Sequence, residues 1–141
     1  MSENAQENCI FCKIVAGELP SSKVYEDDKL FAFMNLQQKN PGHTLIVPKD
    51  HHRNIYDINE DTAAEVGRLS VRMAKAIKAA FNPDGMNVLQ NSEPAAMQSV
   101  FHYHLHVIPR YTGDDLFAIF RAPAASPDEL NANAEKIKAS L

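Results

Sequence analysis

The sequence has few of the features that mark specialised protein classes. Two cysteines and no tryptophan occur among 141 residues, and five glycines are too few for a collagen-like or glycine-rich chain. Two cysteines cannot form the disulfide framework of a small secreted domain. No internal repeat is present, which excludes a solenoid. We therefore expect an ordinary globular protein.

Long apolar runs and an excess of positive charge are also missing. Lys and Arg total 14 against 18 Asp and Glu, giving a net charge of −4, so nucleic acid is not a predicted partner. No apolar segment approaches the roughly 20 residues that cross a bilayer. The polar, acidic residues 1–8 do not resemble a secretory signal. We expect no membrane association and a cytoplasmic location.

The hydrophobic pattern predicts an α+β protein with one domain over residues 1–141. Asn59 is a suitable N-cap for a long helix whose apolar stripe should cover a sheet. In the C-terminal extension 113–141, three apolar residues indicate packing rather than an exposed coil; they are Phe117, Ile119 and Phe120. The remaining expected elements are a short helix over 9–17, extended segments over 23–26, 30–34, 43–47, 86–90 and 100–110, and a final helix around 127–139.

The most informative segment is Val100–Arg110, in which three of the six histidines occupy alternate positions. A strand has a side-chain period of two, so His102, His104 and His106 should share one face and apolar residues the other. Each imidazole has an ordinary pKa of about 6.5, which suits proton transfer, nucleophilic attack or metal binding near neutral pH. This row predicts a functional site.

Three interpretations of the row are open from the residues alone. The histidines could form a solvated strand face, a catalytic metal site with three histidine ligands, or a metal-free site in which one imidazole attacks phosphorus. Same-face neighbours on a strand lie about 6–7 Å apart, which strains a single ion held by all three.

Residues 102–108 resemble the signature of the histidine-triad (HIT) family at all seven positions. The resemblance continues through Cys9–Pro20, Leu30–Asn35 and Pro41–Lys49, and covers residues 8–112. It is strongest to small bacterial members near the nucleoside-phosphoramidate and dinucleoside-polyphosphate hydrolases. It implies a five-stranded antiparallel meander covered by one long helix, with short N-terminal and C-terminal helices, and a homodimer formed through the strand and long-helix region.

The resemblance also implies a reaction at the α-phosphorus of a purine nucleoside phosphoramidate or dinucleoside polyphosphate. His104 would attack to give a nucleotidyl-histidine intermediate, and water would release the nucleoside monophosphate without a catalytic cofactor. His43 and His106 would assist. The implied substrate-binding residues are Asn35, Asn91, Gln98, Ser99 and His106. The alternatives are a nucleotidyltransferase and a nucleotide-binding module with weak or no turnover.

Cys9 and Cys12 form a Cys-x-x-Cys pair that fits a closed structural zinc site when two histidines complete it. Two buried, metal-free cysteines are the simpler alternative. The resemblance implies zinc bound by Cys9, Cys12, His51 and His102, with His52 as the alternative to His51.

Met97 departs from the family pattern, because relatives carry glycine at this point of the loop before the histidine row. Glycine allows a positive φ and a close backbone approach to an anion, which methionine adopts at a cost. We expect the loop to be reshaped here.

Overall fold

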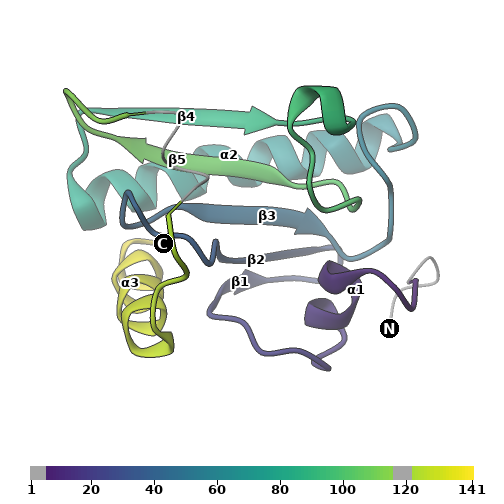
Figure 1. The fold of residues 1–141 in the computed structure, drawn as a ribbon, viewed down its shortest axis with the longest axis horizontal. Helices are drawn as coiled ribbons and strands as arrows, with labels where there is room; N and C mark the ends of the chain where they lie inside the picture. The colour runs from purple at the N-terminus through teal and green to yellow at the C-terminus, as the bar shows by residue number, and fades with distance from the viewer. Residues whose placement is uncertain (1–5, 116–121) are drawn as a thin grey trace.

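The computed structural model describes residues 6–115 and 122–141, so Phe117, Ile119 and Phe120 lie outside the described residues. A five-stranded antiparallel sheet forms its centre, in the order β1-β2-β3-β5-β4 (Figure 1). Within the described ranges, none of the helices combines the length and apolar character needed to cross a membrane. The elements are α1 (Ile10–Val15), β1 (Lys23–Glu26), β2 (Leu30–Met34), β3 (Thr44–Pro48), α2 (Glu60–Phe81), β4 (Gly85–Gln90), η1 (Pro94–Ala96), β5 (Leu105–Arg110) and α3 (Pro127–Ser140).

The strand order differs in one respect from a simple meander. Strands β1, β2 and β3 follow one another, but β5 then lies between β3 and β4. The reason is α2, whose 22 residues span about 33 Å and carry the chain along the sheet before it re-enters at β4. The position beside β3 is thereby left for β5, which pairs on both sides.

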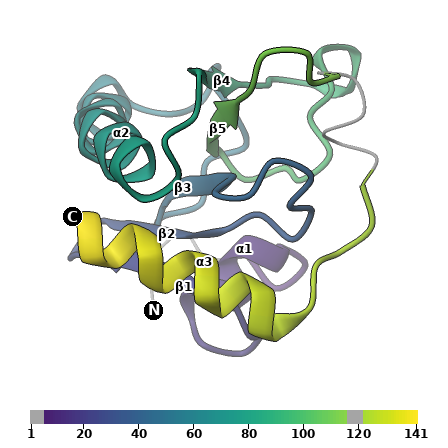
Figure 2. The same ribbon diagram turned by 90° about the vertical axis from the view of Figure 1, so that its left-hand side faces the viewer.

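Helices α2 and α3 bury one face of the sheet. Asn59 caps α2 by accepting a hydrogen bond from the Thr62 N–H, as the sequence predicts. The expected C-terminal helix is present as α3, which packs beside α2 and against the same core (Figure 2). The buried helical residues of this core are Val66, Leu69, Met73, Ala76, Ile77, Leu130, Ala134 and Ile137.

The opposite face is covered near α1 by a second, smaller core. The Cys9 thiol accepts a hydrogen bond from the Cys12 N–H and so serves as the N-cap of α1, and Gly17 follows the helix at φ +81°. Phe11 packs edge-on to Phe33 with ring centroids 5.3 Å apart. Both cysteines are buried in this core, which brings their sulfur atoms close to the histidine row.

Strand β5 begins at Leu105, five residues later than the sequence predicts. Its first residue, Leu105, pairs with Ile46 of β3 and Gln90 of β4, and neither strand pairs with residues 100–104. A hydrogen bond of 2.7 Å from the Tyr103 N–H to the His52 carbonyl holds this segment instead. The predicted alternation persists from residue 102, since Tyr103, Leu105 and Val107 pack with the α2 core.

The contribution of α3 to the core can be measured. Ile137 is fully buried, whereas Leu141 at the end of the same helix is 46% exposed. We expect Ile137→Ala to lower the free energy of unfolding by about 3 kcal/mol and Leu141→Ala by less than about 0.5 kcal/mol. Urea unfolding measures both, and equal effects would contradict the packing described.

Candidate functional site

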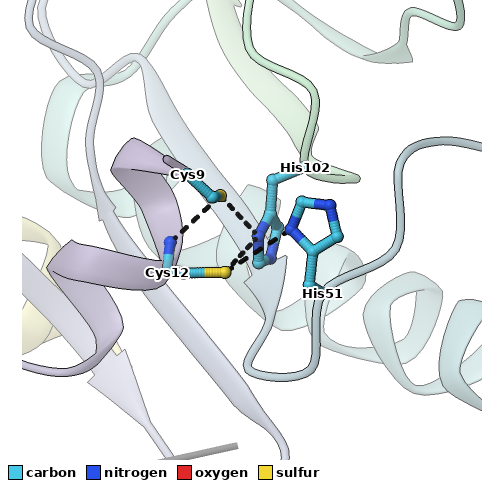
Figure 3. Close-up of side chains that lie close together, drawn as sticks. All are labelled: Cys9, Cys12, His51 and His102. Atoms are coloured by element: carbon cyan, nitrogen blue, oxygen red, sulfur yellow. Dashed lines mark hydrogen bonds between the residues drawn. The ribbon is translucent and has the colours of Figure 1, made fainter. Parts of the chain in front are cut away.

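Four potential metal ligands gather where α1 meets the start of the histidine row. Cys9 and Cys12 come from α1, His51 from the loop after β3, and His102 from the segment before β5 (Figure 3). Their ligand atoms all lie within 4.8 Å of one another. The structure brings His51, rather than His52, into this cluster.

The distances in the cluster fit a tetrahedral metal ion. The Cys9 Sγ lies 3.2 Å from His102 Nδ1, and the Cys12 Sγ lies 3.5 Å from the Nδ1 atoms of both His51 and His102. In a tetrahedral zinc site, sulfur and nitrogen ligands are about 3.5 Å apart. The four residues therefore fit a metal ion with only small adjustments.

A backbone carbonyl orients His102 toward the thiols. Its Nε2–H donates a 2.7 Å hydrogen bond to the Pro48 carbonyl, which can only accept, so Nδ1 carries the lone pair that faces the sulfur atoms. Burial raises the pKa of the Cys9 thiol to about 11. A metal ion would have to displace that proton.

His104 is held as a neutral imidazole by a backbone carbonyl. Its Nδ1–H donates a 2.7 Å hydrogen bond to the His102 carbonyl, which leaves the lone pair on Nε2. The ring is 5% exposed and stands perpendicular to Phe11, with centroids 5.1 Å apart. Burial lowers the pKa of His104, and the hydrogen bond to the carbonyl offsets part of this shift. The imidazole is therefore neutral near pH 7.

His106 and His43 extend the row on the side away from the cysteines. The ring centroids of His104 and His106 are 4.9 Å apart, and His106 Nδ1 lies 2.9 Å from His43 Nε2. Burial is the main cause that lowers the pKa of His43 to about 3 and that of His106 to about 2. Both rings are neutral, so one nitrogen of the pair donates and the other accepts.

Gln38, which the sequence analysis did not single out, fixes the backbone beside His43. Its Nε2–H group donates to the carbonyls of Asn35 and His43 at 2.7 and 2.8 Å, and its Oε1 accepts from the Gly42 N–H at 2.8 Å. An isolated glutamine in a polar loop carries no sequence signal for this role.

The loop before the histidine row has a left-handed residue at Met97, the position where the family resemblance led us to expect glycine. Met97 has φ 73° and ψ 21°, and its side chain is 58% exposed. Met97 thus adopts the glycine-like conformation itself, at a cost of about 1–2 kcal/mol. Glu93, at the other end of the turn, also has a positive φ of 75°.

The predicted substrate-binding residues have different surroundings. Ser99 is exposed, whereas Asn35 and Asn91 are partly buried. The Asn35 amide donates to the Gln37 carbonyl at 3.0 Å. Gln98 is only 4% exposed, and its side-chain amide makes four hydrogen bonds, to Arg53, Asn54, Glu93 and Val100.

Comparison with known proteins agrees with these features. A model of the HIT domain matches residues 16–113. Protein hit of Bacillus subtilis is 47% identical over 119 residues, which cover 84% of this chain and 82% of that protein. The adenosine 5'-monophosphoramidase of Schizosaccharomyces pombe is 33% identical, with 95% of this chain and 98% of that protein covered. The chain belongs to the HIT family.

Solved structures confirm the α+β fold with its five-stranded antiparallel sheet. A Hit-like protein involved in cell-cycle regulation from Bartonella henselae is 41% identical with a TM-score of 0.88, covering 96% of this chain and 98% of that one. A zinc-bound histidine triad family protein from Mycobacterium smegmatis is 34% identical with a TM-score of 0.82, covering 94% and 92% of the two chains.

The buried neutral histidines make stability depend on pH. His43 and His106 titrate at about 3 and about 2 when folded, but near 6.5 when unfolded. Their contribution is fully present above pH 6.5 and is lost as the pH falls, by about 1.4 kcal/mol per pH unit for each ring. Urea unfolding at about pH 5.5 and 4.5 should therefore show a slope that is about one proton smaller in His106→Gln than in the unsubstituted protein. Equal slopes would contradict burial of a neutral ring.

Proposed function

We propose that this protein is a nucleotide hydrolase that cleaves at the α-phosphorus of a purine nucleoside phosphoramidate or dinucleoside polyphosphate. The observation that carries this proposal is His104, a buried neutral imidazole whose Nδ1–H is bound by the His102 carbonyl and whose Nε2 carries a lone pair. The 33% identity to an adenosine 5'-monophosphoramidase supports the substrate class.

The proposed reaction has two displacements at phosphorus. In the first, His104 Nε2 forms a bond to the α-phosphorus while the bond to the amine or phosphate leaving group breaks, and the leaving group takes up a proton that comes from solvent. In the second, water attacks phosphorus and gives up a proton to solvent, the bond to Nε2 breaks, and the nucleoside monophosphate is released. An imidazole suits both steps because it is a good neutral nucleophile and a good leaving group once charge develops on its ring.

The neighbouring residues would stabilise charge and carry protons in this scheme. We propose that His106, supported by His43 at 2.9 Å, contacts a phosphoryl oxygen or the leaving group. The exposed Ser99 and the partly buried Asn91 would bind phosphate, and Asn35 would bind the ribose hydroxyls. Preset hydrogen-bond donors of this kind supply much of the catalysis in phosphoryl transfer.

We further propose that Cys9, Cys12, His51 and His102 hold a structural zinc ion. Two sulfur and two nitrogen ligands complete a tetrahedron and leave no position for substrate, and zinc in such a set supplies folding energy rather than chemistry. In this arrangement the metal would tie α1 and the loop after β3 to the segment that carries His104. No catalytic cofactor is required by the proposed reaction.

We also propose that the protein is a cytoplasmic homodimer. β4 is the outermost strand on its side of the sheet in the described structure, and its Val88 is 47% exposed. Val71 of α2 is 54% exposed. An unpaired strand edge that exposes an apolar side chain is suited to pairing with a second copy.

The role of His104 is tested by hydrolysis of adenosine 5'-phosphoramidate and of a diadenosine polyphosphate. We expect His104→Ala to lower kcat by at least about 10³-fold, because the nucleophile is lost. His52→Ala is the matched control, since His52 lies outside both the metal cluster and the row, and it should retain activity. The proposal fails if His104→Ala keeps most of the turnover on the substrate that the unsubstituted protein cleaves.

The metal proposal is tested by metal analysis and thermal unfolding. We expect close to one zinc ion per chain, lost in Cys12→Ser and His51→Ala but retained in His52→Ala. Removing zinc with a chelator should lower Tm by at least about 5 °C, because the ion binds only the folded cluster. A Tm that is unchanged by chelation, or zinc that remains in Cys12→Ser, would contradict the proposal.

A further inference from the structure

An ion pair joins the loop after β3 to the turn before the histidine row. The Arg53 Nε and Nη2 groups donate to the two carboxylate oxygens of Glu93 at 2.9 and 2.8 Å, and the Asn54 Nδ2 group donates to Glu93 Oε2 at 2.6 Å. The guanidinium carbon also lies 4.3 Å from the ring centroid of Phe101. A two-point Arg–carboxylate contact fixes direction as well as distance.

Gln98 makes a second connection directly beneath this ion pair. Its Oε1 accepts from the Glu93 N–H at 2.8 Å and from Asn54 Nδ2 at 3.1 Å. Its Nε2–H₂ group donates to the carbonyls of Arg53 and Val100 at 2.7 and 3.1 Å. A glutamine amide offers two N–H donors and two acceptor lone pairs, so all four are used by the protein. None remains for a phosphate oxygen.

The turn held by these contacts has an unfavourable backbone conformation at each end, at Glu93 and at Met97. Glu93 has φ 75° and ψ 157°, and Met97 has φ 73° and ψ 21°, regions that favour glycine. Two hydrogen bonds to the Glu93 carbonyl, from the Ala96 and Gln98 N–H groups at 3.0 and 3.2 Å, close the turn. Unfavourable backbone of this kind persists only where the surroundings determine it strongly.

We propose that Arg53, Asn54, Glu93 and Gln98 form a clamp that positions residues 93–99 for phosphate binding. Gln98 is then a positioning residue and not itself a phosphate ligand, and the glycine-free turn of this chain is held by side chains. The clamp starts two residues after His51, so it joins the turn to the segment that carries a metal ligand. This inference rests on the proposed hydrolase function, but its structural part can be tested without substrate.

Four variants distinguish loss of the clamp from the effect of losing any surface ion pair. Glu93→Ala removes the ion pair with Arg53, Gln98→Ala removes the amide contacts beside it, and the double variant removes both sets of contacts. Glu65→Ala is the matched control, because Glu65 also pairs with an arginine, Arg68 at 3.1 Å, on the exposed surface of α2. The control should behave like the unsubstituted protein in every assay.

Hydrogen exchange of the protein alone tests the structural part. We expect the backbone amides of residues 93–99 to exchange at least about tenfold faster in Glu93→Ala and Gln98→Ala, because the turn loses the contacts that hold it. The amides of α2 should be unchanged. Exchange in 93–99 at the rate of the unsubstituted protein would overturn the clamp, whether or not the protein hydrolyses nucleotides.

Kinetics with adenosine 5'-phosphoramidate test the positioning role. We expect kcat to fall about 10- to 100-fold in each single variant with KM changed less than about threefold, since small misplacements at a reacting centre have effects of this size. The double variant should be no worse than the more severe single variant, because both remove the same clamp. Effects that multiply, or a loss confined to KM in Gln98→Ala, would instead make Gln98 a direct phosphate ligand and overturn the proposal.

Absence of turnover in the unsubstituted protein would overturn the hydrolase function and the kinetic role together. Hydrogen exchange would still decide whether the structural clamp exists.

Discussion

Packing of Tyr103, Leu105 and Val107 against the core beneath α2 is the constraint on which the site depends. Because side chains alternate along an extended chain, packing these three residues in the core directs His102, His104 and His106 to the opposite side. Pairing with β3 and β4 keeps Leu105, His106 and Val107 in register. The hydrogen bond from the Tyr103 N–H to the His52 carbonyl holds the residues just before β5. The hydrophobic core therefore lies on one side of this segment and the row of imidazoles on the other.

Two backbone carbonyls determine which ring nitrogen of His102 and of His104 carries the lone pair. The Pro48 carbonyl binds the Nε2–H of His102, which turns the Nδ1 lone pair toward Cys9 and Cys12. The His102 carbonyl binds the Nδ1–H of His104, which leaves the Nε2 lone pair for another partner. Neighbouring histidines thus bond a carbonyl through opposite nitrogens, which leaves Nδ1 of His102 for the proposed metal ion and Nε2 of His104 for the proposed attack on phosphorus. Phe11, on the helix that carries both cysteines, packs against both rings.

Local patterns in the sequence predicted much of this arrangement. The alternation of residues 102–107, the Asn59 cap and the Cys-x-x-Cys spacing are each determined by nearby residues. Features that depend on distant partners were not predictable. The late start of β5 follows from where β3 and β4 end, and the place of α3 depends on packing against α2. The role of Gln98 required knowing that Arg53, Asn54 and Glu93 surround its amide.

The central claim is that His104 forms a covalent bond to phosphorus. The most direct measurement is to mix the protein with an adenosine 5'-phosphoramidate, quench within one turnover in alkali, and locate the nucleotide by peptide mass spectrometry. We predict a nucleotidyl group on His104, stable in alkali and lost in acid, as expected for a bond between phosphorus and an imidazole nitrogen. Rapid hydrolysis with no covalent species, or a nucleotide on another residue, would contradict the account.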